Sequence, residues 1–199
     1  GGASRIEDMA DYALANMPPR CALLGHSMGG RVALEIYRKA PRRVQRLALA
    51  CTGIHPVQPG EEDGRHRLRD LGRTDGIGAL VDSWLPPMIA TAGRTDTDLI
   101  DVLRSMCVDA GLSTYENQIA ALLNRPSVAG LLPSIACPAF VIAGSEDEWA
   151  PVCQHKTIAA AIPGAKLRII EGAGHMAPAE MPDAFNAIIR EWLKAPSAS

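Results

Sequence analysis

The chain has 199 residues, of which 47% are hydrophobic and 21% charged, and its formal net charge is -2. This length is enough for one substantial hydrophobic core and a small subdomain. A nearly neutral chain without a basic block lacks the electrostatic signature of a nucleic-acid-binding protein. Its apolar runs are too short to span a bilayer and no signal-peptide pattern is present, so we expect neither a nucleic acid nor a membrane as a partner.

The five cysteines are widely spaced, and they include neither a C-x-x-C pair nor a zinc-ligand spacing. An odd number of scattered cysteines favours reduced thiols over a disulfide framework. We therefore expect a cytoplasmic protein, and nothing in the pattern predicts a metal or another cofactor.

The chain begins with a predicted helix over residues 6–14, where apolar side chains recur at helical spacing. Ser4 and Glu7 have the spacing of a capping box at its start. The apolar run at 21–24 then predicts a strand buried on both faces, and residues 31–38 are typical of a helix.

A G-x-S-x-G motif, residues 25–29, joins this strand to this helix. A serine in this context lies on a sharp turn, and Gly25 and Gly29 let the strand and the helix pack closely around it. Ser27 is therefore the predicted nucleophile. The backbone N–H of Met28, at the helix N-terminus, is the predicted donor to an oxyanion. The alternative is a glycine-rich turn with an incidental serine.

The middle of the chain differs from both ends. Residues 47–51 predict a second buried strand, but strand-like runs then disappear between residues 55 and 133. This segment is longer than a single crossover needs, so we expect a helical cap inserted between strands of the sheet, with ordinary crossover helices as the alternative. The expected helices lie at residues 62–71, 77–85, 96–109 and 114–123.

Strands and helices alternate again after residue 133. We expect strands at 137–144 and 166–170 and helices at 151–162 and 182–194. This alternation predicts an α/β fold with a mostly parallel sheet and helices on both faces. The expected organisation is a core formed by residues 1–54 and 134–199, with the cap formed by residues 55–133.

A serine nucleophile needs a base, and the base needs an orienting acid. Two loops that follow expected strands supply them, with Asp147 in the first and His175 in the second. Such loops lie at the carboxyl edge of a parallel sheet, where catalytic groups gather, and the order Ser27, Asp147, His175 accompanies this kind of elbow. Alternatives are a solvated acidic turn, a structural histidine, or another acid among Glu146, Glu148 and Glu171.

The segments GHSMGG, GSEDEWAP and GAGHMAPAEMPDAF together resemble an α/β-hydrolase fold enzyme. The segment PRRVQRLALACTGIHP is similar to the strand that leads into the cap of the lactonase- and esterase-like members. The resemblance covers essentially the whole chain. It implies Ser27 as nucleophile, His175 as general base and then acid, Asp147 as the group that holds the imidazole, and the Met28 N–H as one oxyanion donor. It also implies hydrolysis of a small carboxylic ester or lactone through an acyl-enzyme.

Other functions stay open for the same residues. Acyl transfer, cofactor-free perhydrolysis and C–C bond hydrolysis use the same triad, and a non-catalytic small-molecule-binding protein could keep the fold. Serine in the elbow argues against the epoxide hydrolases and haloalkane dehalogenases of this fold. Trp84, Tyr115, Met88 and Met106 are expected to pack mainly inside the cap. The candidate pocket residues are His26, Trp84, Met88, Met106, Trp149 and Met176, with His55 at a cap junction.

The resemblance also predicts what this chain lacks. The family has several strands before the elbow strand, and a loop after an early strand supplies the second oxyanion N–H. Nothing of that kind lies between Gly1 and Arg20. We therefore expect the N-terminal strands and half of the oxyanion hole to be missing. The exposed edge of the elbow strand would then self-associate or pair with a partner chain.

Overall fold

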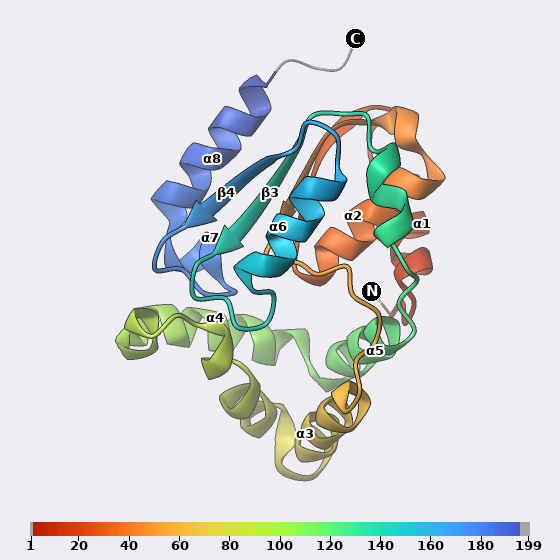
Figure 1. Ribbon diagram of the computed structural model, residues 1–199. Helices are drawn as coiled ribbons and strands as arrows, with labels where there is room; N and C mark the ends of the chain where they lie inside the picture. Colours follow the sequence, from red (N-terminus) through yellow and green to blue (C-terminus); the bar gives the residue numbers. More distant parts are fainter. Residues whose placement is uncertain (1, 196–199) are drawn as a thin grey trace.

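The computed structural model describes residues 2–195. These residues contain a four-stranded sheet in the order β1-β2-β3-β4, and every neighbouring pair of strands is parallel (Figure 1). The carboxyl ends of the strands therefore meet at one edge of the sheet. The strands are β1 (Cys21–His26), β2 (Val44–Ala50), β3 (Ala139–Gly144) and β4 (Lys166–Ile170).

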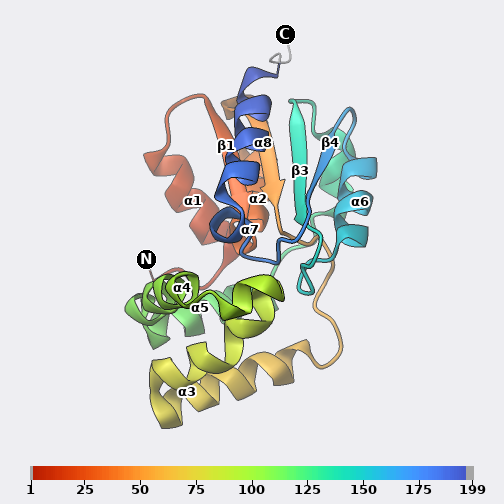
Figure 2. The same cartoon turned by 90° about the vertical axis from the view of Figure 1, so that its left-hand side faces the viewer.

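Helices cover both faces of this sheet, as predicted (Figure 2). The helices around the sheet are α1 (Ile6–Asn16), α2 (Met28–Lys39), α6 (Val152–Ala161), α7 (Ala177–Glu180) and α8 (Pro182–Lys194), with the 3-10 turns η1 (Pro41–Arg43) and η4 (Ala129–Ser134). Alternate residues of a strand point to opposite faces, so Leu47 and Leu49 of β2 pack with α2 and α6, whereas Ala48 and Ala50 pack with α8.

A separate group of helices lies beyond the carboxyl edge of the sheet (Figures 1 and 2). These helices pack around an apolar cluster of their own, which includes Leu80, Leu103 and Ile119. The two helices expected at 62–71 and 77–85 form one kinked element, with Gly76 at the kink in a positive-φ conformation that favours glycine. The elements are α3 (Glu61–Trp84), η2 (Pro86–Met88), η3 (Ala92–Thr95), α4 (Thr97–Ala110) and α5 (Leu112–Leu123).

Two local predictions are wrong. The β1 strand is not buried on both faces, because Ala22 and Leu24 are exposed. The apolar cluster beneath α8 draws its strand residues from β2, β3 and β4, so it leaves this face of β1 uncovered. The predicted capping box is absent as well. Arg5 is the N-cap of α1 and makes no side-chain cap, and Glu7 pairs instead with the Arg5 guanidinium at 3.2 Å.

No helix within residues 2–195 is both long enough and apolar enough to cross a membrane. The five cysteines are free thiols.

Candidate active site

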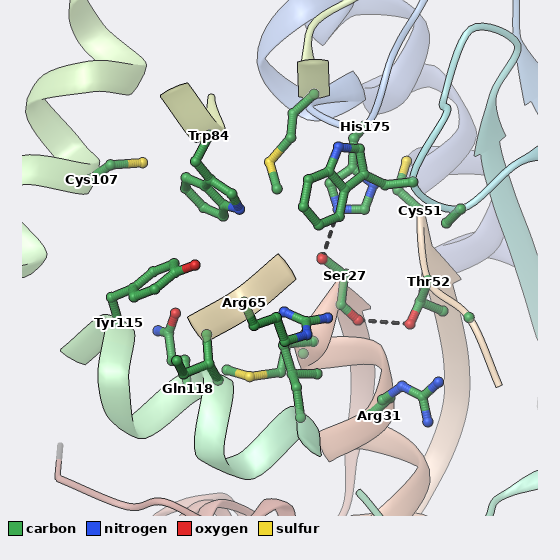
Figure 3. A pocket seen from close by; sticks show the side chains of 18 of the residues that line it. Ser27, Arg31, Cys51, Thr52, Arg65, Trp84, Cys107, Tyr115, Gln118 and His175 are labelled. Atoms are coloured by element: carbon green, nitrogen blue, oxygen red, sulfur yellow. Dashed lines mark hydrogen bonds between the residues drawn. The ribbon is translucent and has the colours of Figure 1, made fainter. Parts of the chain in front are cut away.

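Ser27 lies between β1 and α2 in a strained conformation. Its φ is 52° and its ψ is -122°, a region that residues with a side chain rarely adopt. The surrounding backbone holds it there, since its N–H donates to Ala50 at 2.9 Å and its carbonyl accepts from Gly30 at 3.0 Å. The Thr52 hydroxyl donates to the same carbonyl at 2.7 Å. These bonds turn the Ser27 side chain toward the carboxyl edge of the sheet (Figure 3).

The glycines of the motif have different roles. A Cβ on Gly25 would lie 2.6 Å from the carbonyl carbon of Gly29, and one on Gly30 would lie 2.7 Å from the Thr52 hydroxyl oxygen. A Cβ on Gly29 would meet nothing within 4 Å. The prediction that Gly29 permits the close packing is therefore wrong. Gly25 and Gly30 permit it, because the strand approaches the first turn of α2 at these two positions.

The three predicted catalytic side chains form one hydrogen-bonded series (Figure 3 draws its first bond). The Nε2 atom of His175 lies 2.7 Å from the Ser27 hydroxyl, and its Nδ1 atom lies 2.9 Å from the nearer oxygen of Asp147. The His175 and Asp147 side chains are 6% and 0% exposed. A neutral His175 that donates its Nδ1–H to Asp147 has a free lone pair on Nε2, which can accept a hydrogen bond from the Ser27 hydroxyl.

Asp147 is the acid that reaches His175. Its carboxylate also accepts the backbone N–H groups of Trp149 at 2.9 Å and Ala150 at 2.8 Å, so its orientation is set on two sides. Among the alternative acids, Glu146 accepts the Thr91 N–H, and both Glu148 and Glu171 are exposed.

The loop that carries His175 is attached to the segment that follows the kinked helix. The His175 N–H donates to the Met88 carbonyl at 2.8 Å. The Glu180 carboxylate accepts the N–H groups of Ala90 at 2.7 Å and Gly174 at 3.1 Å. Sequence reasoning missed Glu180, although it follows His175 by only five residues.

His26 supports the same loop, since its Nε2–H donates to the His175 carbonyl at 2.7 Å. Burial lowers its pKa, which favours the neutral ring. The imidazole of His26 and the indole of Trp149 lie 5.4 and 6.3 Å from the His175 ring. His26 thus joins the end of β1 to the loop that carries His175.

A cavity of about 820 Å³ opens in front of Ser27, between the sheet edge and helices α3, α4 and α5. This volume suits a small organic molecule. Trp84 and Tyr115, expected mainly inside the cap, meet edge to face at 6.0 Å and lie across the cavity from Ser27 (Figure 3). The cavity wall includes every predicted pocket residue, namely His26, Trp84, Met88, Met106, Trp149 and Met176, together with His55.

The wall also contains charged residues that sequence reasoning missed. Arg125 binds both oxygens of Glu61 at 2.6 and 2.7 Å, and Arg65 binds Glu61 at 2.8 Å. Burial opposes ionisation of Glu61, but hydrogen bonds from Arg125, the Gln58 N–H and Arg65 hold its pKa at about 2. Glu61 and Arg65 lie one turn apart on α3, but Arg125 lies beyond α5, so no local motif joins the three.

Arg31 is the third arginine of this wall. It is 5% exposed and donates one hydrogen bond, of 2.7 Å, to the His55 carbonyl. Burial and then the positive charge of Arg125 lower its pKa to about 10. One signal could have found it, because it lies four residues after Ser27, in the first turn of the helix that follows the elbow.

A parallel α/β sheet with a serine elbow and a hydrogen-bonded Ser–His–Asp series at its carboxyl edge defines the α/β-hydrolase class. The chain matches the Alpha/beta hydrolase family over residues 2–188 and belongs to that family. This bears out the resemblance and the predicted fold class.

Solved structures and curated relatives agree with this assignment. A thermophilic esterase from Thermogutta terrifontis is similar with a TM-score of 0.88 and 29% identity, over 96% of this chain and 73% of that one. The enol-lactonase from Burkholderia xenovorans LB400 has a TM-score of 0.85 and 26% identity, over 95% and 73%. A 2-hydroxy-6-oxononadienedioate/2-hydroxy-6-oxononatrienedioate hydrolase of Pseudomonas putida is 27% identical, over 88% of this chain and 63% of its own length.

Proposed function

We propose that this chain carries the catalytic centre of a serine hydrolase that cleaves a small carboxylic ester or lactone. The series Ser27–His175–Asp147 carries the proposal, because it joins a nucleophile, a base and an orienting acid in front of a cavity of small-molecule size. The likeness to an esterase and to an enol-lactonase supports the same reaction class.

In the proposed reaction, His175 removes the Ser27 hydroxyl proton as the oxygen attacks the substrate carbonyl. The resulting imidazolium stays paired with Asp147. The negative oxygen of the tetrahedral intermediate accepts the N–H of Met28, which as the first residue of α2 has no acceptor within its helix. When the C–O bond breaks, His175 returns the proton to the leaving alkoxide, and the acyl group stays on Ser27.

The second half of the proposed reaction uses the same atoms. His175 removes a proton from a water molecule, whose oxygen attacks the acyl carbonyl. The intermediate collapses, Ser27 regains its proton from His175, and the carboxylic acid leaves. No cofactor is needed for either half.

A second candidate is hydrolysis of a C–C bond next to a carbonyl, which the relationship to the Pseudomonas putida hydrolase favours. Acyl transfer, perhydrolysis and a non-catalytic binding role stay as further alternatives. Parallel assays of a 4-nitrophenyl ester and of a 2-hydroxy-6-oxo-dienoate separate the two hydrolytic candidates, because only the second reaction breaks a C–C bond.

A fluorophosphonate probe tests the hydrolase proposal directly, since it reacts with activated serines. We expect labelling at Ser27, and Ser27→Ala should abolish it. Asp147→Asn should slow labelling by about 10³- to 10⁴-fold, because the amide favours the wrong imidazole tautomer. Glu148→Gln is the matched control and should leave the rate unchanged. A folded chain that resists the probe, or equal slowing in both variants, would contradict the proposal.

A further inference from the structure

The cavity in front of Ser27 has an excess of positive charge. Its wall contains three arginines, Arg31, Arg65 and Arg125, but among the described lining residues the only carboxylate is that of Glu61. Arg125 and Arg65 both pair with Glu61, so this carboxylate is already shared. With the histidines neutral, the lining carries a formal charge of two positive units.

Arg31 is the arginine without an ionic partner. No carboxylate of residues 2–195 forms an ion pair with it, and its one hydrogen bond goes to the His55 carbonyl. A buried charge without a partner is costly. His55 does not compensate it, because burial, Arg31 and Arg125 lower the His55 pKa and keep its ring neutral.

The guanidinium of Arg31 is nevertheless reachable. Two buried nitrogens within residues 2–195 lack a hydrogen-bond partner, on Arg43 and Trp192, and neither belongs to Arg31. The unpaired N–H groups of Arg31 therefore keep accessible surface. Arg31 is one of the residues that line the cavity, and it lies on the α2 side of Ser27 (Figure 3).

The position of Arg31 relative to the nucleophile limits what can bind there. Ser27 is the N-cap of α2 and Arg31 lies in the first turn of that helix, and both line the same cavity. A substrate whose carbonyl lies at Ser27 can therefore place a second group at Arg31. A guanidinium offers a flat pair of N–H donors that matches the two oxygens of a carboxylate.

We propose that Arg31 binds a carboxylate of the substrate, so that the preferred substrate is an ester or lactone carrying a second, free acid group. Arg65 and Arg125, held by Glu61, add positive charge behind this subsite. The proposal rests on the proposed hydrolase function for its reaction but on the unpaired Arg31 for its substrate class.

The test measures binding, so it needs no turnover. The protein is the full chain with Ser27→Ala, and the probes are mono-4-nitrophenyl glutarate and its neutral isostere, 4-nitrophenyl methyl glutarate. Isothermal titration gives both dissociation constants. We expect the acid to bind at least about 10-fold more tightly than the neutral ester, as charged hydrogen bonds commonly provide.

Adding Arg31→Met should weaken binding of the acid and bring the ratio of the two dissociation constants close to one. The matched control is Arg104→Met, which removes an exposed arginine that pairs with Asp82 at 2.6 Å, and it should preserve the ratio. Equal affinities in the Ser27→Ala chain would overturn the proposal without any Arg31 variant. So would a ratio that survives in a folded Arg31→Met chain, or inorganic phosphate that binds more tightly than the acid.

Failure of the hydrolase function has a different signature. A chain that resists the fluorophosphonate probe but still prefers the acidic ester would be a binding protein for carboxylates. A chain that is labelled at Ser27 but does not distinguish the two esters would be a hydrolase with another substrate class.

Discussion

At the scale of single residues, strain and burial determine which groups near Ser27 can react. Cys51 is the second non-glycine residue with a positive φ, at 46°, and it also lines the cavity. Burial and then the negative charge of Asp147 raise its pKa to about 12. The Cys51 thiol therefore stays protonated at neutral pH and does not compete with Ser27 as a nucleophile.

His155 links the segment after β2 to helix α6. It is fully buried, its Nε2 atom accepts the Thr52 N–H at 3.1 Å, and its Nδ1–H donates to the Pro151 carbonyl at 3.2 Å. Only the neutral ring can make both bonds, because protonation of Nε2 removes the acceptor. Burial lowers the pKa of His155 accordingly.

This arrangement predicts a loss of stability in mild acid. Because the His155 pKa is lower in the folded chain, the unfolded chain binds more protons below about pH 6.5. The free energy of unfolding should fall as the pH drops from about 6.5 through the lowered value. His155→Gln should reduce this fall, and at pH 7.5 it should cost about 1–3 kcal/mol because the Thr52 N–H loses a well-placed acceptor.

Urea unfolding of both chains at pH 7.5 and pH 5.5 measures this effect. His66→Gln is the control, since His66 lies on α3 and takes no part in the hydrogen bonds of His155. An unchanged pH dependence in a folded His155→Gln chain would show that His155 does not contribute. Burial also lowers the pKa of His26 and His55, so part of the pH dependence should remain.

At the scale of elements, hydrogen bonds between segments far apart in the chain hold the site in place. The loop after β4 carries His175 and is bound to the Met88–Ala90 segment by the Met88 carbonyl and the Glu180 carboxylate. A Cβ on Gly174 would lie 2.6 Å from the Ala90 nitrogen, so this approach requires glycine. The segment between α3 and α4 thus also holds the proposed base in place.

The elbow offers a matched pair of glycine substitutions. Gly25→Ala should destabilise the chain by about 1–3 kcal/mol, because the added Cβ meets backbone that cannot move aside easily. Gly29→Ala should be neutral or stabilise slightly, because it lies in open space within α2 and alanine is the better helix former. Urea unfolding and the rate of fluorophosphonate labelling measure both effects. Equal costs at the two positions would contradict the assigned roles.

At the scale of the whole molecule, β1 forms an open edge of the sheet. In residues 2–195 its one strand partner is β2, and Leu24 on its uncovered face is 43% exposed. An unpaired apolar edge is a template for another strand. We propose that a second copy of this chain pairs with this edge at high concentration.

Sedimentation or light scattering over a range of concentrations tests this association. The average mass of the particle should rise with concentration. Leu24→Lys should weaken the association, because it places a charged side chain on the strand that pairs with the second copy. Val102→Lys, at an exposed position on α4, is the control. A particle of constant monomer mass at every concentration would rule the association out.

Local patterns in the sequence determined most of the elements and the catalytic candidates. The G-x-S-x-G motif places Ser27 directly after a strand, and the alternation of strands and helices predicts a parallel sheet. Asp147 and His175 also follow strands, so they are expected at the same edge of the sheet as Ser27. These inferences need only the chain order and the direction of each strand. The division into a core and a cap stays a prediction.

Only the tertiary structure decided which residues share the cavity wall and with what charge. Arg31 lies on α2, Glu61 and Arg65 lie one turn apart on α3, and Arg125 follows α5, so no single motif in the sequence brings all four together. The exposure of one face of β1 could not be predicted from the sequence either, because the burial of a strand depends on where distant helices pack. Local residue patterns encode the elements and the order of the triad, whereas the charged cavity wall, on which the proposed substrate selectivity rests, arises from contacts between segments far apart in the chain.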